Sequence, residues 1–409
     1  MFEIVAIFRN ETTYFIEQIS QNARRVIYSD LVHTFVSPLT EIFLGAFIWR
    51  NTGSLLSVAC YKIGEWIFLP VVFYLNGRLL QKYAVQKTFA LGSVLAGISP
   101  LALMFFGASN NALIFLYGCL YGIGNGFYYA NRNYLEFKET MAKARGYFFS
   151  LLSSISGFAG IVVPLVAGWF IFFGTQTHWY TATYAYWGLF VIAFFLLLLC
   201  AAIIRRGNFA PAQLDSLIIR SAFFWTKRRI LYFAHGFIDG IGFISTLLLL
   251  YLFGNEGALG TAVSITTICI IIASYLFGRF AKERYERITL AISAVLFFIS
   301  GLALVCLPQV SGIVLYVLIM SVISNFAIIV STSIGLTLAD QENKNLLNSR
   351  YAFIVDNELF LNFGRIAGIA IIVSLAIFGS QRLGLFYGPL VISLVHVLCL
   401  IIFFKKSTT

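Results

Sequence analysis

Long apolar segments constrain this chain more than any other feature of its sequence. A helix that crosses a lipid bilayer needs about 20 predominantly apolar residues, and the sequence contains twelve segments of this kind. They are residues 27–49, 54–76, 88–107, 111–131, 147–173, 182–204, 230–253, 258–280, 289–308, 312–339, 352–378 and 384–404. Charged residues make up 11% of the chain, whereas soluble domains usually contain about 25%. The sequence therefore predicts an all-α, multi-pass membrane protein with twelve transmembrane helices.

The basic residues indicate how these segments are oriented. With a cytoplasmic N-terminus, 23 of the 28 Lys and Arg residues fall in cytoplasmic segments and three fall within spans. The other two, Arg50 and Arg382, fall on the opposite side of the membrane. Lys and Arg are enriched in the cytoplasmic loops of membrane proteins. We therefore predict that both termini are cytoplasmic. The net charge of +11 follows from this topology, so nucleic-acid binding is not needed to explain it.

A basic connection near the middle of the chain divides the twelve segments into two sets of six. We expect a cytoplasmic N-terminal segment (1–25), an N-terminal six-helix bundle (26–204), a central cytoplasmic loop (205–229), a C-terminal six-helix bundle (230–404) and a cytoplasmic tail (405–409). The N-terminal segment is either an amphipathic helix on the membrane surface or a partly ordered tail.

Similar basic segments follow the second and the eighth apolar segments. GRLLQKYAVQKT begins at Gly77 and GRFAKERYERIT begins at Gly278, which is 201 residues later. This duplicated Gly-Arg pattern resembles the signature loop of the major facilitator superfamily, although the Asp and the second Gly of that signature are missing here. The resemblance implies two parallel six-helix repeats and a cytoplasmic gate. The candidate gate residues are Gly77, Arg78, Lys82, Gly278, Arg279, Glu283 and Asp356.

Ionisable residues interrupt several of the apolar segments. A charged group at the centre of a bilayer costs about 2.5–3.5 kcal/mol on insertion scales, so these groups must face one another or a hydrated cavity. The resemblance implies a central cavity lined by spans one, four, seven and ten, with spans two, five, eight and eleven beside it. The candidate substrate-cavity and proton-coupling residues are Asp30, His33, Glu41, Lys62, Glu65, Asn125, Tyr129, Arg132, His235, Asp239, Glu358, Asn362 and Arg365.

Helical spacing groups some of these candidates together. Residues three or four positions apart share a helix face, so Lys62 and Glu65 can form an ion pair. Asp30 and His33 place an acid beside a histidine, which suits a proton relay. Structural alternatives remain open: the Lys62–Glu65 pair could join two helices, and Arg365 could be a substrate clamp or a contact between helices.

These features predict a secondary transporter rather than an enzyme. The sequence has no G-x-x-x-x-G-K-[ST] phosphate-binding motif, so we expect no cofactor and transport driven by an ion or solute gradient. We predict alternating access, proton coupling and a small polar or amphiphilic organic solute. We also expect a monomer in the plasma (inner) membrane that binds no nucleic acid.

Two alternative functions remain open. Ferroportin-type facilitators resemble this chain in having an Asp and a His on the first span, which suggests a divalent metal ion held by Asp30, His33, His235 and Asp239. The Asp–His spacing is three rather than four here, and the expected cysteine on the seventh span is absent. The second alternative is a membrane sensor that does not transport.

Overall fold

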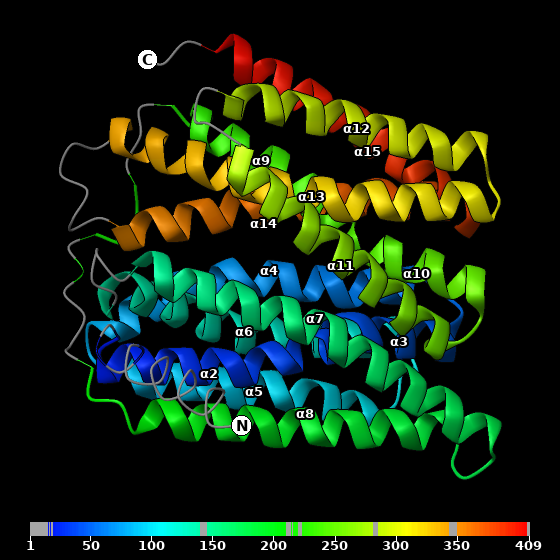
Figure 1. The fold of residues 1–409 in the computed structure, drawn as a ribbon, viewed down its shortest axis with the longest axis horizontal. Coiled ribbons are helices and arrows are strands. Elements are labelled where there is room, and N and C mark those ends of the chain that lie inside the picture. The colour runs from blue at the N-terminus through cyan, green and yellow to red at the C-terminus, as the bar shows by residue number, and fades with distance from the viewer. Residues whose placement is uncertain are drawn as a thin grey trace, which may run out of the picture.

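The computed structural model describes residues 15, 17, 19–139, 145–209, 214, 216–219, 223–280, 285–342 and 350–406, and their regular elements are helices (Figure 1). The first half of the chain contains α2 (Gln21–Pro38), η1 (Leu39–Phe43), α3 (Leu44–Thr52), α4 (Leu55–Leu80), α5 (Val85–Phe106), α6 (Asn111–Glu139), α7 (Arg145–Gln176) and α8 (Ala182–Arg205). The second half contains α9 (Lys227–Gly240), α10 (Gly242–Phe253), α11 (Glu256–Phe280), α12 (Glu286–Cys306), α13 (Val310–Glu342), α14 (Arg350–Phe378) and α15 (Gln381–Lys405).

Eleven helical stretches in the described residues are long and apolar enough to cross a membrane. The first of them combines α2, η1 and α3, and another combines α9 and α10. The remaining predicted span, 111–131, lies within the 29-residue helix α6. Its Gly and Tyr residues lower its hydropathy, although its length exceeds the roughly 20 residues that a span needs. The predicted all-helical membrane architecture is therefore confirmed.

Several of the helices begin at a capping side chain. Ser20, Ser54, Thr181, Thr226 and Ser380 each accept a hydrogen bond from a backbone N–H in the first turn of the helix that follows. Such caps satisfy amide groups that have no partner within the helix. The connection between α3 and α4 is very short because Gly53 adopts a left-handed conformation with φ of 59°.

The first helix of each half is broken near its middle, which the sequence analysis did not predict. Pro38 ends α2, and five residues of π-helix follow it in η1. Proline lacks the N–H that would continue the α-helical ladder, and π-turns are often found at functional sites. In the second half, Ile241 separates α9 from α10 and is flanked by Gly240 and Gly242.

The helices pack closely both within each half of the chain and between the halves. In the first half α4 and α5 pack on α6, while α8 packs on α5 and α2. In the second half α9 packs on α14, and α12 packs on α13 and α15. The two halves meet chiefly where α7 contacts α11 and α4 contacts α14. In Figure 1 the helices up to α8 form the lower part of the molecule, and α12 to α15 form the upper part.

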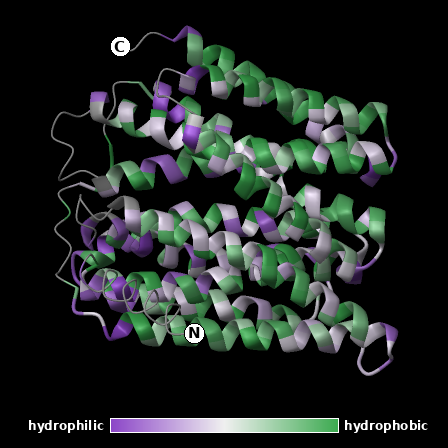
Figure 2. Cartoon of the chain, in the orientation of Figure 1, coloured by the Kyte–Doolittle hydropathy of each residue, from purple (hydrophilic) through white to green (hydrophobic). Residues whose placement is uncertain are grey.

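Hydrophilic residues gather at one end of the helices, on the left of Figure 2, and the helix surfaces are otherwise mostly apolar. We call this end the basic end, because it carries Arg78 at the end of α4, Arg205 at the end of α8, Lys227 at the start of α9 and Lys405 at the end of α15. The other end is the opposite end.

Candidate functional site

A cavity of about 720 Å³ lies between the two halves of the chain. Its lining comes from α2 and η1, α4, α6, α9, α10, α13 and α14, which correspond to predicted spans one, two, four, seven, ten and eleven. The ionisable lining residues are Glu41, Lys62, Glu65, Arg132, His235, Asp239, Glu358 and Arg365. Tyr129, another residue of the predicted cavity set, also lines it.

Lys62 lies between two carboxylates. Its Nζ is 2.9 Å from Glu65 Oε2 on the same helix and 2.7 Å from Glu41 Oε2 on η1. The side chains of Lys62 and Glu65 are buried, whereas that of Glu41 is 41% exposed. The Lys62–Glu65 pair has the spacing that the sequence predicts, and the contact with Glu41 adds a connection between α4 and the first helix.

Arg365 has a similar environment in the second half. Its Nε donates to Asp239 Oδ2 at 2.6 Å, and its Nη1 lies 3.4 Å from Glu358 Oε1. Asn362 is fully buried and bridges this group, because it donates to Glu358 Oε1 at 2.9 Å and accepts from Arg365 Nη1 at 2.9 Å. Asn362 therefore holds the charged group in place without lining the cavity itself.

Glycines allow this second group to form. A Cβ added to Gly236 would lie 2.2 Å from Leu361 O, and one added to Gly240 would lie 2.7 Å from Arg365 Cα. Because real Cβ atoms do not approach so closely, only glycine at these positions lets the backbones of α9 and α14 meet. This close approach brings Asp239 to Arg365.

Arg132 is the third base held by two carboxylates. Its Nε lies 2.5 Å from Asp30 Oδ1, and its Nη2 lies 3.1 Å from Glu136 Oε1. Tyr128 also donates its hydroxyl hydrogen to Asp30 at 3.1 Å. Arg132 lines the cavity, while Asp30 and Glu136 lie behind it.

Three residues of the predicted set, Asp30, His33 and Asn125, lie apart from the cavity. These three residues are buried but lie outside the cavity lining. The ring of His33 stacks on Tyr128 with centroids 3.7 Å apart, and Asp30 turns toward Arg132. The Asp30–His33 pair thus packs against α6 instead of facing the cavity, because aromatic stacking and the ion pair each direct one of the two side chains.

The candidate gate residues are spread over the basic end. Gly77 packs on Tyr351 of α14, where an added Cβ would lie 2.6 Å from the Tyr351 ring. Arg78 donates to Tyr74 Oη at 2.5 Å. Lys82 follows α4 and is exposed, and Glu283 lies outside the described residues. Gly278 and Arg279 lie in the last turn of α11.

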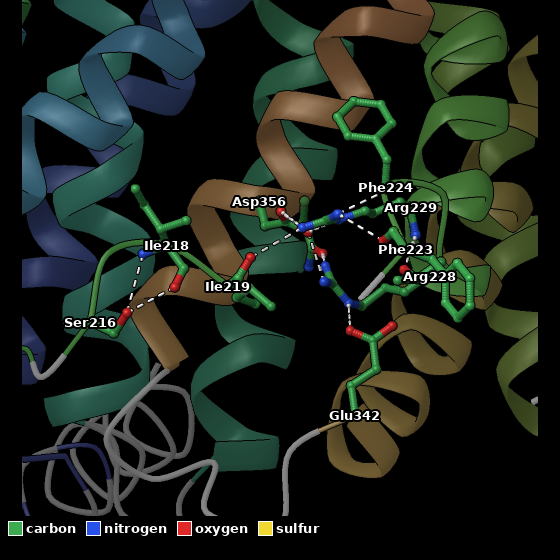
Figure 3. A network of polar contacts seen from close by, with 11 residues as sticks. Ser216, Ile218, Ile219, Phe223, Phe224, Arg228, Arg229, Glu342 and Asp356 are labelled. Carbon is green, nitrogen blue, oxygen red and sulfur yellow. Dashed lines mark hydrogen bonds and ion pairs between the residues drawn. The ribbon is translucent and has the colours of Figure 1, made fainter. Parts of the chain in front are cut away.

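Asp356 is held by two neighbouring arginines of α9 (Figure 3). Its carboxylate accepts hydrogen bonds from Arg228 Nη2 and Arg229 Nη2, both at 2.7 Å. Arg228 also donates to Glu342 Oε2 at 2.9 Å, and Arg229 donates to Phe224 O at 2.9 Å. These contacts all lie within the second half and its preceding loop. Asp356 and Arg228 together therefore join α9, α13 and α14, whereas a gate would join the two halves.

Contacts between the halves are found at both ends of the helices. At the opposite end, Arg50 Nε lies 2.6 Å from Glu256 Oε1, which also accepts from Tyr186 Oη at 2.9 Å. At the basic end, Tyr351 Oη donates to Phe73 O at 2.7 Å and accepts from Asn76 Nδ2 at 3.1 Å. None of these pairings could be predicted from the sequence, because they depend on how the helices pack.

Trp66 is a further cavity residue that the sequence analysis missed. Lys62 Nζ lies 5.9 Å from the centroid of its ring, and Arg365 Cζ lies 5.8 Å from it. Trp66 therefore connects the charged groups of the two halves. Its position directly after Glu65 could have predicted a cavity role. The chain contains so many aromatic residues, however, that one Trp does not stand out.

The described residues contain no group of three or more His, Cys, Asp or Glu side chains that could hold a metal ion. Among the four proposed metal ligands, Asp30 and Asp239 bind arginines and His33 stacks on Tyr128. His235 lines the cavity.

The helices, the buried charges and the central cavity define an integral, multi-pass membrane protein. Residues 52–355 match the family model of the Major Facilitator Superfamily, and the chain belongs to this superfamily of transporters. The resemblance inferred from the duplicated loop is therefore confirmed. Membership in a family of transporters supports the expectation that the protein is not an enzyme.

The chain is also similar to a bacterial protein by sequence and to solved transporters by fold. The chain is 22% identical to YqgE of Bacillus subtilis (strain 168) over 90% of its own length and 85% of that protein. Its fold is similar to the nucleoside transporter NupG, with a TM-score of 0.66, 14% identity and coverage of 95% of this chain and 100% of NupG. It is also similar to an inward-facing bacterial homologue of the iron transporter ferroportin, with a TM-score of 0.64, 15% identity and coverage of 94% and 99%. At these identities the similarity to solved structures shows the fold alone.

Proposed function

We propose that this protein is a secondary active transporter that moves a small polar or amphiphilic organic solute by alternating access, coupled to protons. The observation that carries the proposal is the cavity of about 720 Å³ between the two halves, lined by eight ionisable residues. Ligand cavities usually measure about 300–1,000 Å³. Ionisable residues inside a membrane typically mark substrate or proton pathways.

In this proposal the two halves act as six-helix bundles that move against each other around the cavity. The contact between Arg50 and Glu256 closes the opposite end, and the contact between Tyr351 and Phe73 joins the halves at the basic end. Alternating access requires one set of contacts to break while the other persists. The excess of Lys and Arg at the basic end supports a cytoplasmic location for this end and for both termini. The protein would lie in the plasma (inner) membrane.

Proton coupling has a physical basis in the paired charges. Protonation of Glu41 would remove one of the two carboxylates that hold Lys62, and protonation of Asp239 would do the same for Arg365. Each change alters a contact between two helices, since Glu41 and Lys62 lie on η1 and α4, and Asp239 and Arg365 lie on α9 and α14. A proton can therefore bias the helix arrangement.

The test is a proteoliposome assay with a pH-sensitive dye trapped inside. Small organic solutes are added one at a time, followed by Mn²⁺, Co²⁺ and Fe²⁺. We expect an organic solute to drive proton movement, and we expect Asp239→Asn to abolish it without loss of folded protein. Proton movement with the metal ions alone would instead favour a metal transporter. Solute binding without flux would favour a membrane sensor, and either result would overturn the proposal.

A further inference from the structure

We propose that the cavity binds its solute as an organic cation, a protonated amine or guanidinium group, with Glu41 as the principal anionic contact. This inference rests on the proposed transport function and names the substrate class of the same site. It follows from three independent features: the balance of buried charge, the exposure of the carboxylates and the aromatic lining.

The charged groups contain more acids than bases. Lys62, Arg132 and Arg365 each contact two carboxylates. The six carboxylates belong to Asp30, Glu41, Glu65, Glu136, Asp239 and Glu358. With histidine neutral, the three bases and four acids that line the cavity leave a formal excess of one negative charge, and Asp30 and Glu136 behind the lining raise this excess to three. Because an uncompensated buried charge is strongly unfavourable, these groups favour added protons or a bound cation and disfavour an anion.

Glu41 is the carboxylate most available to a solute. Its side chain is 41% exposed, compared with 32% for Asp239, 17% for Glu358 and 5% for Glu65. Lys62 occupies its Oε2 at 2.7 Å, while the contact of Oε1 with the Tyr121 hydroxyl is a long one of 3.4 Å. Glu41 can therefore accept a hydrogen bond from an N–H group of a solute without first losing Lys62.

Asp239 provides a second anionic contact on the other side of the cavity. It lies in the last turn of α9, next to the helix break at Ile241. The C-terminal end of a helix carries a partial negative charge that favours a nearby cation. Glu41 also lies within a helix break, in η1. The first helix of each half thus contributes one acidic residue at the point where its α-helical structure is interrupted.

The remaining lining distinguishes an organic cation from a metal ion. Trp66, Tyr129, Tyr232 and Phe243 line the cavity, and aromatic faces attract organic cations within about 6 Å. Trp66 already accommodates the cationic groups of Lys62 and Arg365 at 5.9 and 5.8 Å. A dehydrated metal ion would need several converging ligands, and the described residues contain no such group.

The experiment compares three probes with one carbon skeleton on the purified full-length protein in detergent. The probes are 4-phenylbutylamine, 4-phenylbutan-1-ol and 4-phenylbutanoate, and binding is measured from the shift in thermal unfolding temperature. We expect the amine to bind at least tenfold more tightly than the alcohol or the acid. Glu41→Gln should weaken amine binding at least tenfold, and Glu41→Asp should recover part of it. Glu17→Gln, which removes an exposed carboxylate outside the cavity, should bind the amine like the unmodified protein.

Several results would overturn the inference. Equal binding of the three probes, no binding of the amine, or unchanged amine binding by a folded Glu41→Gln variant would each contradict it. The proteoliposome assay separates this failure from failure of the transport proposal. If the alcohol or the acid drives proton movement and the amine does not, the protein transports but does not select cations. If the amine binds at Glu41 without any flux, the cation site stands and the transport proposal fails.

Discussion

Lys62 is held by carboxylates from two different helices, and this makes its replacement costly. Removing one partner of a buried ion pair typically destabilises a protein by about 3–5 kcal/mol, because the other charge stays buried without compensation. In Lys62→Met, Glu65 would keep its buried position near Glu41. We expect a clear fall in thermal unfolding temperature for Lys62→Met, and a smaller fall when Glu41→Gln and Glu65→Gln are added. Equal losses in the single and triple variants would contradict the pairing.

Arg228 offers a second prediction at the residue scale. Its side chain is fully buried and contacts Glu342, Asp356 and the ring of Phe353. We expect Arg228→Met to reduce the unfolding free energy by about 1.5–3 kcal/mol, because charged hydrogen bonds are lost while Arg229 still holds Asp356. Arg205→Met is the matched control, since Arg205 is exposed at the end of α8. Similar unfolding temperatures for both variants would show that the group in Figure 3 adds no stability.

Local spacing explains which residue pairs were predictable. The Lys62–Glu65 pair follows from helix geometry alone, since residues three positions apart share a face. The partner of Lys62 on η1, Glu41, does not follow from spacing, because it lies on a different helix and the contact depends on how the two helices pack. Similarly, spacing groups Arg365 with Glu358, whereas its contact with Asp239 depends on how closely α9 approaches α14.

At the scale of whole elements, hydropathy predicts the helices well but not their interruptions. The apolar runs continue through η1 and through Ile241, so a search for spans reads each first helix as unbroken. Pro38 and the Gly240–Gly242 stretch were visible signals. Proline and glycine are also common in continuous transmembrane helices, so neither signal specifies a break. Glu41 and Asp239, which both line the cavity, nevertheless lie within or next to these breaks.

The contact between α7 and α11 depends on glycine. A Cβ added to Gly260 would lie 2.0 Å from Pro164 O, and one added to Gly168 would lie 2.3 Å from Glu256 O. We expect Gly260→Ala to force the two helices apart and to lower transport at least tenfold in proteoliposomes. Gly188→Ala on α8 is the control, because its Cβ would meet nothing within 4 Å and Ala favours a helix over Gly by about 1 kcal/mol. Full transport by folded Gly260→Ala would contradict a tight α7–α11 contact.

At the scale of the whole molecule, the two sets of contacts between the halves differ in chemistry. The opposite end uses an ion pair, Arg50 with Glu256, strengthened by the hydroxyl of Tyr186. The basic end uses neutral hydrogen bonds of Tyr351 with Phe73 and Asn76. Weakening the ion pair should favour the state in which the opposite end is open. Weakening the hydrogen bonds of Tyr351 should favour the state in which the basic end is open.

This reciprocity can be measured by labelling a cysteine placed in the cavity. Thr246, a lining residue on α10, is replaced by cysteine after the six native cysteines have been changed to serine. Arg50 is 40% exposed, so we expect its ion pair to contribute about 1 kcal/mol. A change of that size alters the ratio of two states about fivefold. Glu256→Gln should increase labelling by a membrane-impermeant maleimide from the opposite end about fivefold, and Tyr351→Phe should decrease it. If both variants change labelling in the same direction, the two contacts do not control alternate states of one cavity.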